Sequence, residues 1–191
     1  MVVKDIIYFH QPGPRNTDSV AEAVKKRCEE LGIGYVVVAS NTGETALRFW
    51  NVLKDTNVKL VAVTEHAGFS GGDKVFLTPE KRKELEEKGV DVLIASHMLS
   101  GVGRSISNKF GGISHVEIIA HTLRRIGQGI KVAVEVSIMA ADAALIPTDA
   151  EIIAVGGSGK GADAAAVIKP AHMNNFFDLE IREIIAMPRK S

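Results

Sequence analysis

A group of hydroxyl and amide side chains lies between a branched apolar segment and an amphipathic one. The segment "VVVASNTGETALRFW" has three consecutive valines before this polar loop and a helix-like apolar pattern after it. Hydroxyls and free backbone N–H groups at a helix N-terminus form a binding site for an anion, typically a phosphate. Alternatively, Thr42 or Thr45 only caps the helix. The candidate ligands in this loop are Ser40, Asn41, Thr42, Gly43, Glu44 and Thr45.

A second candidate loop, "GGSGKGAD", follows the apolar segment "EIIAV". Its G-x-G-x-x-A spacing resembles a dinucleotide fingerprint, but the strand-like "AAAVIKP" follows instead of a helix. A P-loop is also excluded, because Gly161 stands where that motif needs Ser or Thr. The loop is therefore either an ordinary turn or a set of backbone N–H groups that, with Lys160, wraps an anion or a sugar. Gly156 and Gly157 are its candidate binding residues.

The composition excludes several classes of function. The 23 Lys and Arg residues balance the 23 Asp and Glu residues, so we expect neither a nucleic-acid nor a membrane-surface partner. No apolar run approaches the ~20 residues of a membrane span, and the N-terminus lacks a signal-peptide pattern, which favours a cytoplasmic protein. The single cysteine, Cys28, lies on an apolar helical stripe and is expected to be a buried structural residue. No His, Asp, Glu and Cys residues have metal-ligand spacing, so we predict no metal.

Strand-like and helix-like segments alternate along the chain. The expected strands are Asp5–Phe9, Tyr35–Ala39, Lys59–Thr64, Val90–Ala95, Lys131–Met139 and Glu151–Val155. The expected helices are Asp18–Leu31, Thr45–Lys54, Pro79–Lys88 and Ser114–Arg125. Unbroken apolar strands alternating with helices predict a three-layer α/β/α fold with a mostly parallel sheet, in a single domain over residues 1–191. Ala164–Pro170 and Leu179–Met187 have no helix between them, which predicts an antiparallel C-terminal addition.

This architecture predicts where a ligand binds. Open parallel sheets bind ligands outside the carboxyl ends of their strands, near the topological switch point. The loops expected there, such as "SNTGET", "TEHAGFSGGD", "SHMLSGVGRSISNKFGG", "MAADAALIP" and "GGSGKGAD", are rich in Gly, Ser, His and Asn. The turns at the other edge, such as "LGIG" and "KDTN", are short. We therefore expect the site at the elaborated edge.

Two segments carry a resemblance to a known family. "VVVASNTGETALRFWNVLKDTNVKLVAVT" resembles the carboxy-terminal regulatory domain of pyruvate kinases, in which such a loop grips a phosphate of an allosteric sugar bisphosphate. Ser40, Thr42, Gly43 and Thr45 match the hydroxyl and glycine positions of that loop. "IIAVGGSGKGADAA" is similar to the glycine-rich effector loop of the family. The catalytic barrel is absent from this sequence, and Asn41 or Glu44 stands where some relatives have a basic residue.

Over its full length the chain resembles a group of stand-alone archaeal proteins of this fold. The segments "YFHQPGPRNT", "HAGF", "SHMLSGVGRSISNKFGG", "IMAADA" and "PAHMNNFFDLEI" carry this resemblance. The group is associated with bound FMN and has no established activity. The resemblance thus implies FMN as the cofactor, with its 5′-phosphate on the Ser40–Thr45 loop.

The resemblance also directs attention to residues that could contact the rest of a flavin. Candidates for the ribityl chain or the ring are Thr64, His66, Gly68 and Phe69. Candidates for apolar walls are His97, Met98, Leu99 and Met139, although Met139 could equally pack in the core. Asp142 is expected at a strand end, where it either bonds the ring or caps a short helix. Arg104, His172 and Asn174 are further residues whose place in the pocket is open.

Three functions compete. The first is an FMN-binding or sensor protein, the second an FMN-dependent oxidoreductase acting on a small molecule, and the third a structural module whose glycine loops are only turns. We favour a protein that binds a phosphorylated small molecule, FMN. Related domains often associate, so a homo-oligomer is an additional expectation, with Glu180–Pro188 as a candidate contact.

Overall fold

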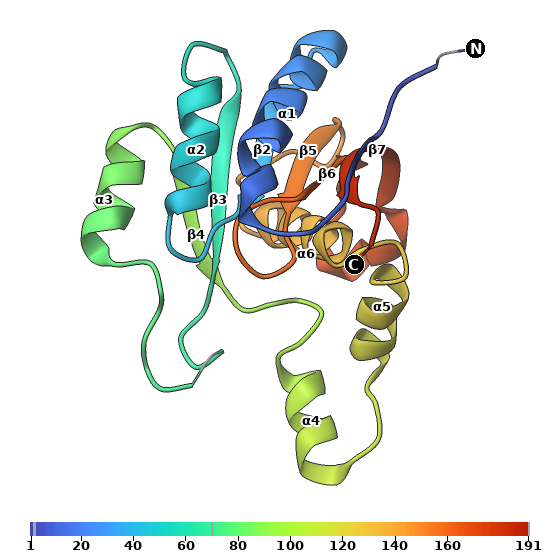
Figure 1. Cartoon of the computed structure of the whole chain (residues 1–191). Helices are drawn as coiled ribbons and strands as arrows, with labels where there is room; N and C mark the ends of the chain where they lie inside the picture. Colours follow the sequence, from blue (N-terminus) through green and yellow to red (C-terminus); the bar gives the residue numbers. More distant parts are fainter. Residues whose placement is uncertain (2, 70, 191) are drawn as a thin grey trace.

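The computed structural model describes residue 1 and residues 3–69 and 71–190, which form a seven-stranded sheet (Figure 1). Along the sheet the strands follow the order β1-β7-β6-β5-β2-β3-β4. Their bounds are β1 Ile7–Phe9, β2 Tyr35–Ala39, β3 Lys59–Glu65, β4 Asp91–Ala95, β5 Ile152–Gly156, β6 Ala164–Lys169 and β7 Glu180–Pro188. Among the strands of the described residues, β6 alone runs against its neighbours, because it pairs antiparallel with both β5 and β7 while the remaining pairs are parallel. The predicted mostly parallel sheet with an antiparallel C-terminal addition is confirmed.

Helices cover both faces of this sheet (Figure 1). The helices are α1 Thr17–Leu31, α2 Glu44–Leu53, α3 Pro79–Glu87, α4 Val102–Phe110, α5 His115–Leu123 and α6 Gln128–Asp142. Two 3-10 turns, η1 Pro14–Asn16 and η2 Met173–Asp178, complete the elements of the described chain.

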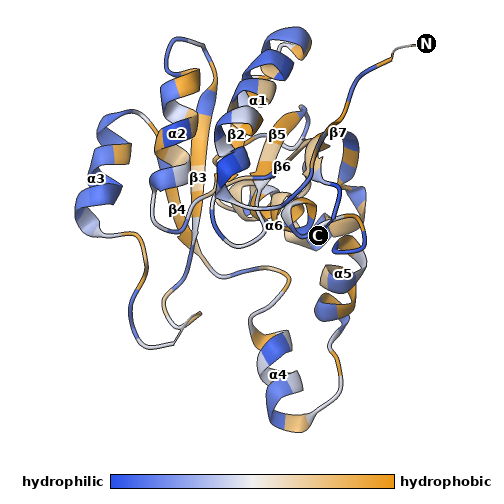
Figure 2. Ribbon diagram, viewed as in Figure 1, coloured by the Kyte–Doolittle hydropathy of each residue, from blue (hydrophilic) through white to orange (hydrophobic). Residues whose placement is uncertain are grey.

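The two cores follow from the alternation of side chains along each strand. Val36 and Val38 of β2 pack with α1 and α2, whereas Val37 between them packs with α6. Figure 2 shows the apolar strands enclosed between helices whose outer faces are hydrophilic. The predicted three-layer α/β/α arrangement is therefore the observed one.

The predicted strand Lys131–Met139 is wrong, because this segment lies inside helix α6. Its β-branched residues suggested a strand, but α6 is buried on almost every side, and a helix buried all round has no amphipathic period. Strands β4 and β5 run in the same direction in the sheet. The chain must therefore cross over between them, and such crossover connections are usually helical. Helix α6 forms the last part of this crossover. The long loop expected after β4 also contains an unpredicted helix, α4.

This correction moves two candidate residues. Met139 lies within α6 and not at the end of a strand. It is 5% exposed and packs in the core, which was the alternative interpretation of this residue. Asp142 lies in the last turn of α6, where its carboxylate accepts a hydrogen bond from the Met173 N–H and pairs with His172. Because α6 leads into the start of β5, the segment "MAADAALIP" lies at the amino edge of the sheet, opposite the predicted site.

The C-terminal segment Glu180–Pro188 forms strand β7, which pairs with β6 along its length. In the described chain, β1 pairs with the last three residues of β7, Ala186 to Pro188. A contact between copies through this segment stays a prediction.

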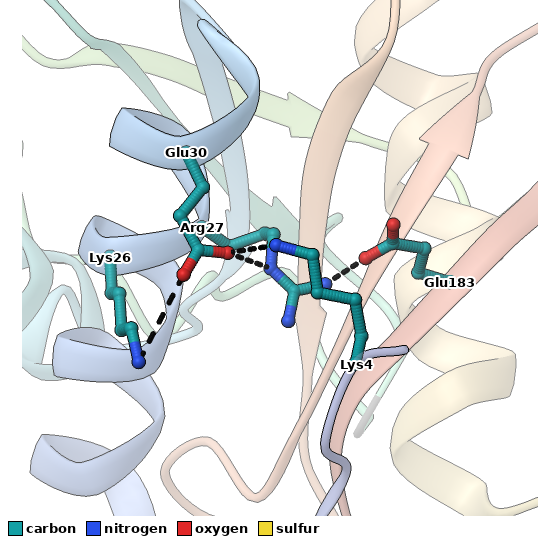
Figure 3. Close-up of polar contacts among 5 residues, drawn as sticks. All are labelled: Lys4, Lys26, Arg27, Glu30 and Glu183. Carbon is teal, nitrogen blue, oxygen red and sulfur yellow. Dashed lines mark hydrogen bonds and ion pairs between the residues drawn. The ribbon is translucent and has the colours of Figure 1, made fainter. Parts of the chain in front are cut away.

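Ion pairs hold the N-terminal segment against the body. Arg27 of α1 pairs with Glu183 of β7 and, through Nε at 3.1 Å, with Glu30 (Figure 3). Lys4 Nζ lies 2.6 Å from the same Glu30 carboxylate, and this hydrogen bond is the main cause that lowers the pKa of Glu30. The Lys4–Glu30 pair thus connects the segment before β1 to the end of α1, and the Arg27–Glu183 pair connects α1 to β7.

Candidate ligand-binding site

A cavity of about 580 Å³ lies at the carboxyl edge of the sheet. The ends of β2 and β3 and the loop after β4 form its base, the loops after β2 and β5 form one flank, and α6 forms the other. β2 and β5 are parallel neighbours, but the chain leaves β2 toward β3 and leaves β5 toward β6, so the connections diverge here. The cavity thus occupies the topological switch point, where open α/β sheets bind their ligands.

The loop after β2 presents unpaired donors. Gly43 has φ +87°, which favours glycine, and its backbone begins α2. Ser40 is turned inward, because its hydroxyl accepts from the Ala46 N–H at 3.1 Å and its own N–H donates to the Val63 carbonyl. Within the described chain, no acceptor receives the backbone N–H groups of residues 42–45. A helix N-terminus with free N–H groups and two threonine hydroxyls is suited to an anion.

Polar contacts hold this loop from behind. Asn41 donates to Glu65 at 2.9 Å, and the Thr64 hydroxyl donates to the Asn41 carbonyl. Glu44, which would repel an anion, is paired at 3.3 Å with Lys81. Hydrogen bonds to Glu84 and Glu44 raise the pKa of Lys81, so its charge is well maintained.

The glycine loop after β5 is organised by Asp163, which is fully buried. The Asp163 carboxylate accepts hydrogen bonds from the backbone N–H groups of Gly13 at 2.9 Å and Ser158 at 3.1 Å. The Thr17 hydroxyl accepts from the Ala162 N–H at 3.0 Å. A Cβ at Gly157 would lie 2.1 Å from the Gly161 carbonyl oxygen, so the loop can close on itself only with glycine there. The loop is therefore a built structure, and it places Lys160 on the cavity.

The opposite flank carries a buried ion pair. Lys131 and Glu135 of α6 are 6% and 3% exposed, line the cavity, and form a salt bridge one helical turn apart. Glu135 also accepts the Leu99 N–H at 2.9 Å. Burial lowers the pKa of Lys131, and the charge of Glu135 opposes this effect. Arg104 and Arg124 line the same flank, and neither forms an ion pair within the described residues.

An aromatic cluster lies at the end of β3 and β4. The rings of Phe69 and His97 are 4.3 Å apart, and His66 lies 5.8 Å from His97. Among the described residues, the buried Nδ1 atoms of both histidines have no hydrogen-bond partner. Burial is the main cause that lowers the pKa of His97, against the charge of Glu135. His97 is thus a neutral imidazole at neutral pH.

The structure brings together part of the predicted set. The candidates that line the cavity are Ser40, Asn41, Thr42, Glu44, Thr45, Thr64, Phe69, His97 and Gly157. Gly43, His66, Gly68, Met98, Leu99 and Gly156 are near neighbours in the chain that do not line it, and Met139 and Asp142 lie elsewhere. The residues that sequence reasoning missed include Thr17, Arg48, Glu65, Arg124, Lys131 and Glu135. The sequence held a signal for two of these residues. Lys131 and Glu135 are four residues apart, and side chains at this spacing can pair on a helix but not on a strand.

Comparison with known proteins decides the family. The pattern of the family "Pyruvate kinase, alpha/beta domain" matches residues 18–169. The chain belongs to this family. The part that matches the pyruvate kinase alpha/beta domain includes the loops after β2 and β5 and the whole of α6. β1 and β7 lie outside it.

Two solved structures have low sequence identity to this chain. Pyruvate kinase of Cryptosporidium parvum in complex with ADP is 16% identical over 79% of this chain and 23% of its own, with a TM-score of 0.42. O-ureido-L-serine synthase is 18% identical over 51% of this chain and 30% of its own, with a TM-score of 0.32. This chain spans about a quarter of the length of the C. parvum pyruvate kinase that it matches.

Two further findings concern the described residues. None of the helices in the described ranges combines the length and the hydrophobicity that crossing a membrane requires. In the same part of the chain, no three His, Cys, Asp or Glu side chains are arranged to hold a metal ion.

Proposed function

We propose that this chain binds FMN in the cavity at the carboxyl edge of the sheet, with the 5′-phosphate on the loop after β2. The observation that carries this proposal is the set of N–H groups at residues 42–45 that have no acceptor in the described chain. Thr42 and Thr45 line the same cavity, and each carries a hydroxyl group. A phosphate would satisfy these donors, and the N-terminal end of α2 would favour its charge.

Two cations that line the cavity on this flank support a single phosphate. They are Arg48 of α2 and Lys160 of the glycine loop. Arg48 is shared with Asp18 at 3.5 Å, and Glu44 stands in the loop itself. One phosphate held mainly by N–H and hydroxyl groups suits this balance better than a sugar bisphosphate with two.

The remainder of the cavity suits a flat aromatic ring on a polar chain. Its volume of about 580 Å³ is within the usual range of ligand pockets. Val63, Val132 and Val136 offer apolar surface, and Phe69 and His97 offer aromatic surface. Thr64, Ser100 and Gln128 offer polar partners for hydroxyl groups. This combination favours FMN over a ligand that is polar throughout.

Bound FMN would supply hydride or electron transfer. The role that we propose is that of a cytoplasmic ligand-binding or sensor protein, akin to the archaeal FMN-associated group. An FMN-dependent oxidoreductase is the second candidate, and a specific observation favours it. The buried Lys131 and Glu135 and the half-buried His97 all line the cavity, and ionisable groups with such surroundings are common at catalytic sites.

The first experiment is the visible absorption spectrum of freshly purified protein, with mass spectrometry of what denaturation releases. A flavin spectrum and the mass of FMN support the proposal, and reduction by NADH or NADPH then separates the two roles. Colourless protein that also fails to take up added FMN contradicts the proposal.

The double variant Thr42→Ala/Thr45→Ala tests the phosphate position. Each hydroxyl bonded to a charged group contributes about 1.5–3 kcal/mol, so we expect FMN affinity to fall at least about tenfold. Fluorescence titration of free FMN measures this, with Thr122→Ala on α5 as the control that leaves affinity unchanged. Unchanged affinity in the double variant would refute the assignment of this loop.

A further inference from the structure

The α6 flank of the cavity holds a positive charge that the fold does not fully use. The Lys131 ammonium carries three N–H donors, and its acceptor within the described residues is the Glu135 carboxylate. The side chain is 6% exposed, so water has little access to the remaining donors. A buried ammonium with spare donors is costly unless a further acceptor reaches it.

Glu135 fixes this ammonium in place and does not remove the need for an acceptor. One carboxylate oxygen of Glu135 accepts from Lys131 and the other accepts the Leu99 N–H at 2.9 Å. Glu135 is thus satisfied from two sides and holds Lys131 against the cavity. Arg104 and Arg124 line the same flank, so this end of the cavity is cationic even with Glu135 present.

The cavity therefore has two cationic ends with different surroundings. Arg48 and Lys160 lie at the phosphate end, beside the N-terminus of α2. Lys131 lies on the other face of the sheet, beside the aromatic cluster of Phe69 and His97. A ligand that matches both ends has a phosphate at one end and, at the other, an aromatic ring that accepts hydrogen bonds and can become negatively charged.

We propose that Lys131, held by Glu135, binds the hydrogen-bond-accepting edge of the flavin ring, so that the cavity binds reduced FMN more tightly than oxidised FMN. This inference rests on the proposed binding of FMN and extends it. Reduction by two electrons gives the flavin ring a negative charge unless a second proton follows, and a nearby ammonium stabilises that charge. The protein would thus raise the reduction potential of its FMN relative to a site without this cation.

The test compares the midpoint potential of FMN bound to the wild type and to Lys131→Met. We expect the preference for reduced over oxidised FMN to fall at least about tenfold, which lowers the potential of the two-electron couple by about 30 mV. Lys160→Met is the matched control, because a cation at the phosphate end affects both redox states equally. It should weaken FMN binding and leave the potential unchanged.

Because Lys131→Met leaves Glu135 buried without its partner, a second variant protects the test from misfolding. Lys131→Met/Glu135→Gln removes both charges with little change of shape, and it should lower the potential by a smaller amount, because the loss of the Glu135 charge opposes the loss of the Lys131 charge. Lys131→Arg should retain most of the wild-type value. FMN binding with an unchanged potential in both Lys131→Met variants overturns this inference and leaves the proposed function standing. Failure of the wild type to bind FMN overturns both.

Discussion

At the scale of single residues, Asp163 connects the glycine loop to the N-terminal segment. Its fully buried carboxylate receives N–H groups from Gly13, which precedes α1, and from Ser158 in the loop itself. The Ser158 hydroxyl lies 3.4 Å from the other carboxylate oxygen. A buried charge is stable only when such donors compensate for lost hydration. Asp163 therefore shapes the loop after β5 although it does not line the cavity.

Replacing Asp163 with Asn should test this role. The amide keeps the shape but removes the charge that strengthens the hydrogen bonds from the Gly13 and Ser158 N–H groups, so we expect the free energy of unfolding to fall by about 1–3 kcal/mol. Urea denaturation followed by circular dichroism measures the change. The exposed Asp149→Asn should alter stability by less than about 0.5 kcal/mol. Equal stability of the two variants would show that the buried contacts of Asp163 contribute nothing.

At the scale of elements, the contact between α6 and β5 depends on glycine. A Cβ at Gly156, the last residue of β5, would lie 2.1 Å from the carbonyl oxygen of Gly129 in the first turn of α6. The sequence suggested Gly156 as a ligand-binding residue, and the structure gives it a packing role. This close approach brings the N-terminal half of α6, and with it Lys131, to the cavity.

Gly156→Ala should therefore force α6 away from the sheet. We expect a loss of about 1–3 kcal/mol in the free energy of unfolding, as for other overpacked interiors. Gly34→Ala is the control, because a Cβ there meets no atom within 4 Å and the backbone is not left-handed. Chemical denaturation of both variants gives the comparison, and a Gly156→Ala protein as stable as wild type would contradict the packing argument.

Local sequence pattern predicted most elements because each carries a clear signal. β2, β3 and β4 are apolar runs bounded by polar turns, and α1 has a regular apolar stripe that includes Cys28, which is buried as predicted. α6 carries no such signal, since its Val, Ile and Ala residues face the sheet and its neighbours on all sides. Only its tertiary position identifies it as a helix.

The candidate site was predictable to the same extent. The loops after β2 and β5 have chemically distinctive residues next to well-predicted strands, so their position at one edge followed from the sheet. The ion pair of Lys131 and Glu135 was not found, because on a strand residues four apart lie too far from each other to pair. Because α6 was predicted as a strand, the predicted site lacked the flank of the cavity that α6 forms.

At the scale of the whole molecule, the segment from α4 to α5 stands apart from the sheet. Figure 1 shows α4 projecting away from the body, and the described side chains of this helix include none that is buried. Val102, Ile106 and Phe110, four residues apart, are 76%, 50% and 79% exposed. Short helices without packed faces are only marginally stable in water.

Hydrogen exchange should therefore divide the molecule into two parts. We expect the amide hydrogens of α4 to exchange orders of magnitude faster than those of α6, whose side chains are buried almost throughout. Mass spectrometry of exchanged peptides at neutral pH measures both segments in one sample. Equal protection of the two helices would show that α4 is stabilised by contacts beyond this chain.

The switch-point cavity has a consequence for unfolding. The loops that form one of its flanks follow β2 and β5, which are neighbours in the sheet but far apart along the chain. A ligand held by both loops acts as a reversible cross-link between the two halves of the polypeptide. Each tenfold rise of free ligand above its dissociation constant would then add about 1.4 kcal/mol to the resistance against separating those halves.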